Sequence, residues 1–317
     1  MEIVPESLRD PRIHTSVVDV ADSFTFEVDQ CGDGDEVALC LHGFPEHSFS
    51  WRYQLPALAE LGFTAWAPNL RGYGASSRPQ DLQAYRLDEL VEDVARLIEA
   101  SGKSKVTLIA HDWGAVIAWQ FALRQRLPLQ RLIICNVPHP QAMQDAFGWT
   151  QMRKSWYIFF FQLPWLPEYA LSRDNAQPIA DAFANSAGDS ARFPPEVCDV
   201  FRRNAAQPGA LTAMINYYRG LFRGRRSRPR TDPRTPIDVL TLMIWGEDDV
   251  ALDKSTTLTT GDYVTDFRIR YLPGVSHWVQ QEQPEAVNAM IAAFVQGQEI
   301  PEYSEQGELL PAEGAVP

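Results

Sequence analysis

The sequence lacks any apolar run of the roughly 18 residues that a transmembrane helix requires. Its first ten residues, MEIVPESLRD, also lack the basic stretch and the apolar stretch of a secretory signal peptide. Both absences argue against a membrane-spanning or exported protein. They predict a cytoplasmic location for the chain.

Cysteine is scarce, and the four cysteines are scattered along the chain. Cys31, Cys40, Cys135 and Cys198 lie far apart and form no Cys-x-x-Cys pair. Such spacing argues against a metal centre, a dithiol redox site and a disulfide framework, and it favours a reducing compartment. We therefore expect these side chains to be small buried apolar groups.

Basic residues are outnumbered, because 28 Lys and Arg stand against 41 Asp and Glu and give a net charge of −13 at pH 7. This surplus of negative charge argues against nucleic acid or an anionic membrane as the main partner. The partners that remain are a small neutral ligand and a second copy of the chain in a homodimer. The Arg-rich segment 223–236 contains interleaved Pro and Ser, and we interpret it as a solvated connection.

The chain is long and apolar enough to fold around a large core, since 45% of its 317 residues are hydrophobic. Strand-like runs alternate with helix-like segments such as 87–101, which ends at Gly102. This alternation predicts a mostly parallel sheet covered by helices, which the first two strands enter in an antiparallel arrangement. The eight expected strands lie within 14–20, 23–30, 35–43, 63–69, 105–112, 129–137, 237–249 and 267–278.

Residues 140–236 interrupt the alternation with an aromatic-rich, helix-like region. We interpret this region as a helical cap inserted over the carboxyl-terminal edge of the sheet. The predicted organisation is therefore a core in two parts, 1–139 and 237–298, with the cap between them. A polar tail, 299–317, is expected to wrap loosely or to fray.

The stretch IAHDWGAVIAWQ, residues 109–120, has the form of a nucleophile elbow, a tight turn between a strand and a helix that needs small neighbours. Ala110 and Gly114 are small, but the central residue is Asp112 where many hydrolases have serine. The alternative is that Asp112 only caps the following helix.

Two further turns supply partners for such an elbow. The turn LHGFPE would place the backbone N–H of Phe44 beside that of Trp113 as an oxyanion hole. His42, in the same turn, is expected to pin the loop through hydrogen bonds rather than to act as a base. An acid and then a histidine should follow the nucleophile at the ends of later strands.

The acid and the histidine have clear candidates. WGEDD favours Asp249, although spacing alone does not exclude Glu247 or Asp248, and the other common place for the acid holds Asn136. Of the six histidines, His277 has the required order and position. These residue types predict a triad of nucleophile, base and acid.

Together these motifs resemble the epoxide hydrolases of the α/β-hydrolase fold, in particular the soluble epoxide hydrolases. HGFPE, RGYGASS, AHDWGA, NVPHP, WGEDD and SHWVQQEQP follow the family's order over roughly residues 15–296. The resemblance implies Asp112 as the nucleophile, Asp249 and His277 as the charge-relay pair, and an eight-stranded sheet with a cap. It also implies a detoxifying hydrolase that needs no metal and no organic cofactor.

The family also uses two cap tyrosines that point at the epoxide oxygen. Tyr157 and Tyr218 match these positions, with Tyr217 and Tyr169 as the alternatives. The implied substrate is a small apolar epoxide. The residues expected to bind it are His42, Pro45, Trp156, Phe160, Trp165, Met214, Phe222 and Trp278.

A carboxylate nucleophile suits alkyl transfer, because it is already charged at neutral pH and can displace at a saturated carbon. Epoxide opening would leave an alkyl ester on Asp112, which water activated by His277 would hydrolyse to a vicinal diol. A haloalkane dehalogenase uses the same nucleophile and is the alternative. In that family the residue after His-Gly is often Asn, whereas this chain has Phe44, and a non-catalytic receptor on this fold would retain serine at the elbow.

Overall fold

The computed structural model describes residues 3–20, 24–224 and 232–311. Eight strands form one sheet in the order β1-β2-β4-β3-β5-β6-β7-β8. β2 pairs antiparallel with β1 and with β4, and the other neighbours are parallel, which confirms the predicted sheet and its antiparallel entry. The strands are β1 (His14–Asp19), β2 (Thr25–Cys31), β3 (Glu36–Leu41), β4 (Phe63–Pro68), β5 (Lys105–His111), β6 (Arg131–Cys135), β7 (Leu240–Gly246) and β8 (Phe267–Leu272).

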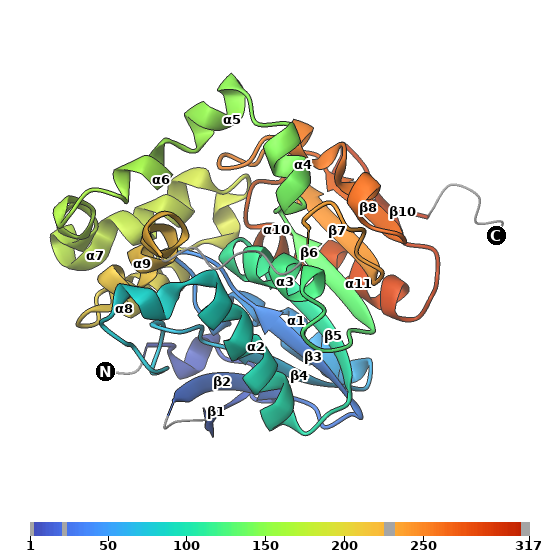
Figure 1. Ribbon diagram of the computed structural model, residues 1–317. Coiled ribbons are helices and arrows are strands. Elements are labelled where there is room, and N and C mark those ends of the chain that lie inside the picture. Colours follow the sequence, from blue (N-terminus) through green and yellow to red (C-terminus); the bar gives the residue numbers. More distant parts are fainter. Residues whose placement is uncertain (1–2, 21–23, 225–231, 312–317) are drawn as a thin grey trace.

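Helices cover both faces of this sheet (Figure 1). α2 and α3 pack on one face, and α1 and α11 pack on the other. Side chains of successive strand residues point to opposite faces, so Val37 and Leu39 join one core layer while Ala38 and Cys40 join the other. The helices of the core are α1 (Gln54–Glu60), α2 (Leu87–Ser101), α3 (Trp113–Leu123), α10 (Val279–Glu282) and α11 (Pro284–Val295).

The burial of these layers follows the sequence pattern. The face of α2 that carries Leu90, Val91, Val94 and Ile98 is buried, and the helix ends at Gly102, whose φ of 68° favours glycine. All four cysteines are free and buried, as expected for small core residues. The buried face of α2 and the buried cysteines could both be predicted, because they depend on local periodicity and composition.

Between β6 and β7 the chain leaves the sheet and forms a run of helices. These are α4 (Pro140–Asp145), α5 (Trp149–Lys154), α6 (Trp156–Phe160), α7 (Leu166–Ser186), α8 (Pro195–Ala205) and α9 (Ala210–Arg223). The segment Arg173–Ala176 has non-helical backbone angles and divides α7 into two parts. Residues of α5, α6, α7 and α9 line one cavity together with residues that follow β3, β5, β7 and β8, so this region lies over the carboxyl-terminal edge of the sheet.

The C-terminal segment is more ordered than the expected loose tail. β9 (Glu302–Tyr303) and β10 (Leu309–Leu310) pair antiparallel, and Ile300 and Tyr303 are buried in the core. The guanidinium of Arg270 in β8 donates to the carbonyl of Ile300 at 2.8 Å. The expectation of fraying is therefore wrong for 299–311, because two apolar side chains anchor a mostly polar segment.

Two parts of the sequence interpretation lie outside the described residues. These are 225–231 of the Arg-rich connection and 312–317 of the tail. Across the ranges that the structure does describe, no helix combines the length and the apolar character needed to cross a bilayer.

Candidate active site

Asp112 occupies the sharp turn between β5 and α3. Its backbone has φ 47° and ψ −119°, an unfavourable conformation for a residue with a side chain. A Cβ on Gly43 would collide with the Asp112 side chain, and a Cβ on Gly114 would collide with the backbone of Leu41. The Asp112 side chain makes no capping hydrogen bond to α3, so capping does not explain an acid at this position.

The turn after β3 presents a backbone donor to this carboxylate. The N–H of Phe44 donates to Asp112 Oδ1 at 2.7 Å. Trp113 is the first residue of α3, and N–H groups in the first turn of a helix have no acceptor within the helix. Of the two predicted oxyanion donors, the N–H of Phe44 therefore reaches Asp112 from a distant part of the chain, and Trp113 directly follows Asp112 in the sequence.

His42 lies in this turn but does not line the cavity. Its Nδ1–H donates to the carbonyl of Gly43 at 2.8 Å, and its Nε2 accepts from the N–H of Leu70 at 3.0 Å. Burial lowers the pKa of His42 to about 4, so the ring is neutral near pH 7. The ring hydrogen-bonds the loop, as expected, and it is not among the residues that line the cavity.

His277 and Asp249 follow the last two strands of the sheet and meet beside Asp112. Nδ1–H of His277 donates to Asp249 Oδ2 at 2.7 Å, while Nε2 lies 3.7 Å from Asp112 Oδ2. Glu247 is paired with a lysine of its own loop, and Asp248 is exposed. Of the three adjacent acids, Asp249 therefore contacts the histidine.

Asp249 is buried in a loop that supplies it with further donors. Its Oδ1 accepts from the N–H groups of Ala251 at 2.7 Å and Leu252 at 2.8 Å. The Nδ2–H of Asn136 donates to Asp249 Oδ2 at 2.7 Å, and Oδ1 of the same side chain accepts from the N–H of Gly246 at 3.0 Å. Asn136 thus orients the acid. Asn136 follows a strand at a place where the acid could have stood, so its position marked it as a site residue, but its role as a partner of Asp249 was not predicted.

The ionisation of these groups is coupled. Burial by itself would lower the pKa of His277, but the carboxylates of Asp249 and Asp112 raise it well above its usual value. Burial would raise the pKa of Asp112, yet the nearby His277 ring and the hydrogen bond from the N–H of Phe44 lower it. The pKa of Asp249 is lowered in the same way, mainly by His277. The two carboxylates therefore favour the charged form of the His277 ring.

A further buried carboxylate, that of Glu46, stabilises the turn after β3 that contains Gly43 and Phe44, called here the oxyanion turn. Glu46 accepts from the N–H of Gly43 at 2.6 Å and from two glutamine amides of α10 at 3.0 and 3.1 Å. Its Oε2 lies 2.7 Å from Nδ1 of His111, whose Nε2–H donates to the carbonyl of His277 at 2.8 Å. Both residues lie within the HGFPE and AHDWGA motifs, but their spacing in the sequence does not predict this contact.

Tyr157 of α6 and Tyr218 of α9 both line the cavity above Asp112. Their ring centroids are 5.9 Å apart, and burial together with the Asp112 charge raises the pKa of both phenols. The alternatives lie elsewhere. The hydroxyl of Tyr217 donates to a backbone carbonyl of the core at 2.8 Å, and Tyr169 is 64% exposed.

The cavity measures about 660 Å³. Besides Asp112, His277 and the two tyrosines, its lining contains Phe44 and three of the predicted pocket residues, which are Pro45, Trp156 and Trp278. Residues that the sequence did not single out complete the wall, among them Lys154 of α5 and Asp181 and Asn185 of α7. The sequence did not predict these residues, because it does not reveal which side of a cap helix faces the cavity.

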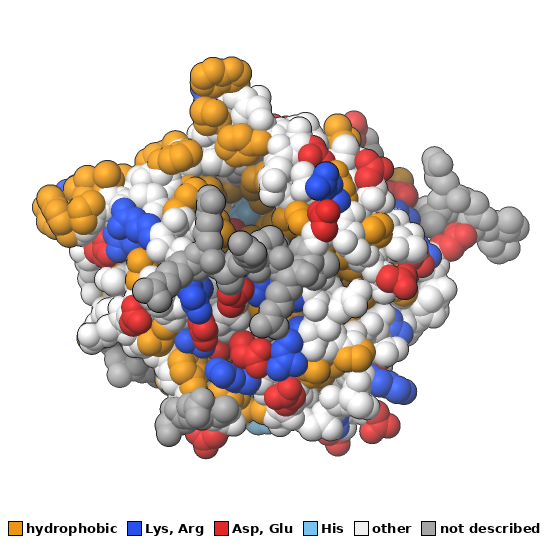
Figure 2. Space-filling view, in the orientation of Figure 1, with side chains coloured by type: hydrophobic (Ala, Val, Ile, Leu, Met, Phe, Trp, Pro, Cys, Tyr) orange, Lys and Arg blue, Asp and Glu red, His pale blue; other side chains and the backbone are white. Residues whose placement is uncertain are grey.

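Besides His42, four predicted pocket residues do not reach the cavity. Met214 and Phe222 lie on α9 one turn before and one turn after Tyr218, roughly 6 Å along the helix axis in each direction. Met214 is buried in the core, and Phe222 is exposed. Phe160 packs on Phe161, and Trp165 is 70% exposed on the outer surface of the cap, where hydrophobic side chains gather over α5, α6 and the start of α7 (Figure 2).

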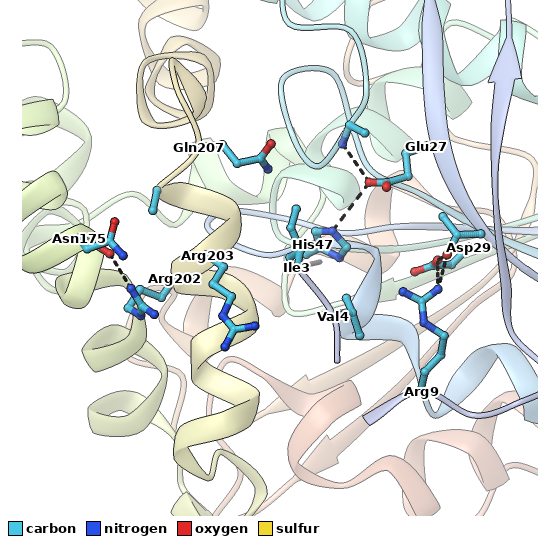
Figure 3. A pocket seen from close by; sticks show the side chains of 13 residues that line it. Ile3, Val4, Arg9, Glu27, Asp29, His47, Asn175, Arg202, Arg203 and Gln207 are labelled. Carbon is cyan, nitrogen blue, oxygen red and sulfur yellow. Dashed lines mark hydrogen bonds and ion pairs between the residues drawn. The ribbon is translucent and has the colours of Figure 1, made fainter. Parts of the chain in front are cut away.

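A larger hollow of about 770 Å³ shares no lining residue with this cavity. It lies between the N-terminal segment, the outer strands and α8 (Figure 3). Arg9 lies 3.6 Å from Asp29 in this hollow, and His47, whose pKa burial holds well below its usual value, lies 4.0 Å from Glu27. The nucleophile candidate and the base candidate converge in the smaller cavity, which is therefore the candidate active site.

Comparisons with known proteins agree with this geometry. A family model described as the alpha/beta hydrolase fold matches residues 37–282. The chain is 37% identical to Epoxide hydrolase 2 of Caenorhabditis elegans, over 83% of this chain and 74% of that protein. It is 38% identical to Epoxide hydrolase 3 of Xenopus tropicalis, over 81% of this chain and 70% of that protein.

Solved structures lead to the same family. The crystal structure of an epoxide hydrolase from Bacillus megaterium in complex with an inhibitor superposes with a TM-score of 0.79 and 30% identity, covering 89% of this chain and all of that chain. The sheet, the elbow and the relatives together show that this chain belongs to the epoxide hydrolases of the α/β-hydrolase fold.

Proposed function

We propose that the protein converts a small apolar epoxide and water to a vicinal diol through an alkyl ester on Asp112. The observation that carries this proposal is the carboxylate of Asp112, held between the N–H of Phe44 and Nε2 of His277 at the base of the cavity. A carboxylate with a lowered pKa is ionised at neutral pH and needs no base before it attacks.

In the first step an Asp112 oxygen bonds to a ring carbon, and the bond from that carbon to the epoxide oxygen breaks. The electron pair of the broken bond moves to the oxygen, which takes a proton or hydrogen bonds from Tyr157 and Tyr218. Alkoxide is a poor leaving group, so acids placed at this oxygen lower the barrier. Both phenols line the cavity and stay protonated, since their pKa values are raised.

In the second step water attacks the ester carbonyl of Asp112 while Nε2 of His277 takes its proton. The N–H groups of Phe44 and Trp113 would stabilise the oxyanion, since Phe44 already donates to one carboxylate oxygen. Collapse of the tetrahedral intermediate breaks the bond between the carbonyl carbon and the alkyl oxygen. That oxygen takes the proton from His277, and the diol leaves. The proton that remains on the Asp112 carboxyl replaces the one that the tyrosine gave in the first step, which restores the carboxylate and both phenols.

The cap of residues 140–236 would determine which epoxides enter, because α5, α6, α7 and α9 supply a large part of the cavity wall. In this organisation the core is formed by 1–139 and 237–298, and 299–317 is a C-terminal extension. A panel of styrene-type, aliphatic and fatty-acid epoxides, assayed beside haloalkanes, separates diol formation from halide release.

The covalent mechanism is tested with His277→Gln. This variant should open the epoxide but fail to hydrolyse the ester, so mass spectrometry should find one alkyl group on Asp112. In heavy-oxygen water, the diol of a single wild-type turnover should carry ordinary oxygen, and the label should appear in Asp112. A labelled first diol together with an unmodified His277→Gln protein would mean direct attack of water on the ring.

A further inference from the structure

Helix α5 of the cap is hydrogen-bonded to the loop that carries Asp249. The side chain of Gln151 is 1% exposed and lies against this loop. Its Nε2–H donates to the carbonyl of Ala251 at 3.1 Å, and its Oε1 accepts from the N–H of Asp253 at 2.8 Å. One amide group therefore binds the backbone of the loop through both its donor and its acceptor.

Lys154, three residues further along α5, binds the same loop. Its ammonium donates to the carbonyl of Asp249 at 2.6 Å and to that of Leu252 at 3.1 Å, and it lies 3.9 Å from the carboxylate of Asp253. Together Lys154 and Gln151 contact the backbone at 249, 251, 252 and 253.

The same loop orients the Asp249 carboxylate. Oδ1 accepts from the N–H groups of Ala251 and Leu252, so the N–H side of these residues faces the acid. Their carbonyls face the cap and accept from Gln151 and Lys154. The loop is therefore fixed from two sides, and a loss of the cap contacts would free it to shift relative to His277.

We propose that Gln151 and Lys154 are positioning residues that act through Asp249 on hydrolysis of the ester. This inference rests on the proposed function, in which His277 and Asp249 act in the second step alone. Ester formation depends on Asp112 and the two tyrosines, none of which these side chains hydrogen-bond among the described contacts. The contact therefore links the position of α5 to that of Asp249.

The test measures the two steps separately in Gln151→Met and Lys154→Met. In Gln151→Met, whose side chain does not line the cavity, rapid-quench mass spectrometry should show ester formation at the wild-type rate and ester hydrolysis slowed about tenfold, because small displacements of catalytic groups cost this much or more. Lys154 also lines the cavity, so in Lys154→Met only the hydrolysis rate of ester already formed is compared, and it should fall to a similar extent. In the steady state, kcat and KM of Gln151→Met should fall together and leave kcat/KM unchanged, since kcat/KM includes only the steps through ester formation. Alkylated protein should accumulate during turnover.

The matched control is Gln141→Met, which removes an exposed hydrogen bond to Asp145 within the cap and leaves the Asp249 loop untouched. Lys154→Arg retains a cationic donor and should restore part of the hydrolysis rate. Lys154 is partly exposed, so Lys154→Met tests the proposal even if the buried Gln151→Met change prevents folding.

Two results would overturn the inference. One is hydrolysis at the wild-type rate in folded variants, and the other is a parallel loss of ester formation, which would mean that these contacts hold the cap tyrosines instead. His277→Gln, run in parallel, separates the two proposals. If His277→Gln accumulates ester while the Gln151 and Lys154 variants hydrolyse normally, only the positioning role fails; if it accumulates none, the covalent mechanism fails.

Discussion

Replacing Asp112 by Asn tests the charge that holds the proton on His277. Nε2 of His277 lies 3.7 Å from Asp112 Oδ2 in a buried site. At about 4 Å two unit charges interact by ~1 kcal/mol in water and ~4 kcal/mol at the effective dielectric of a protein surface. Since one pKa unit corresponds to about 1.4 kcal/mol, Asp112→Asn should lower the pKa of His277 by about 1–3 units.

This variant imitates the alkyl enzyme, in which Asp112 is an uncharged ester. Loss of the negative charge destabilises the imidazolium, so ester formation should turn His277 from an acid into the base that hydrolysis needs. With hydrolysis limiting, kcat should therefore be lost as pH falls through the lowered pKa of His277 in the ester. The free enzyme should keep the raised pKa.

The assay is a nuclear magnetic resonance titration of the His277 ring in ¹⁵N-labelled protein. Asp248→Asn is the matched control. Asp248 directly precedes Asp249 in the loop after β7, is exposed, and makes no hydrogen bond to the His277 ring among the described residues. An unchanged His277 pKa in Asp112→Asn would refute the electrostatic coupling and the base-switching step built on it.

The remaining predictions concern the cap tyrosines and the oxyanion turn. Tyr157→Phe and Tyr218→Phe should each slow ester formation about 10- to 100-fold and together by roughly 10²–10⁴-fold, measured by rapid quench, because each phenol supports the same oxygen. Tyr217→Phe is the control, and damage confined to that variant would contradict the assignment of Tyr218. Glu46→Leu should lower the free energy of unfolding by about 3–5 kcal/mol in denaturant titrations, since buried donors, including His111, lose their charged acceptor. Wild-type stability despite this change would mean that water replaces the carboxylate.

Local physical rules made much of the fold readable from the sequence. Strand runs and the apolar face of α2 follow from periodicity, and Gly102 ends that helix because glycine tolerates positive φ. The Asp112 elbow was readable because the tight turn requires small neighbours at fixed spacing. The tail was misjudged, because the burial of Ile300 and Tyr303 depends on a contact with β8 that composition does not encode.

Sequence alone determined the order of elements, the elbow and the type of each candidate group, because these depend on neighbours a few residues apart. Only the tertiary structure decided which of three adjacent acids meets His277 and which of two adjacent tyrosines lines the cavity, because one step along a loop or helix turns a side chain to a different environment. The same reason hid the supporting residues. Asn136 meets Asp249 across 113 positions of sequence, Glu46 meets His111 across 65 and Gln151 meets Ala251 across 100, and these residues come together only when the sheet, the cap and the loops pack.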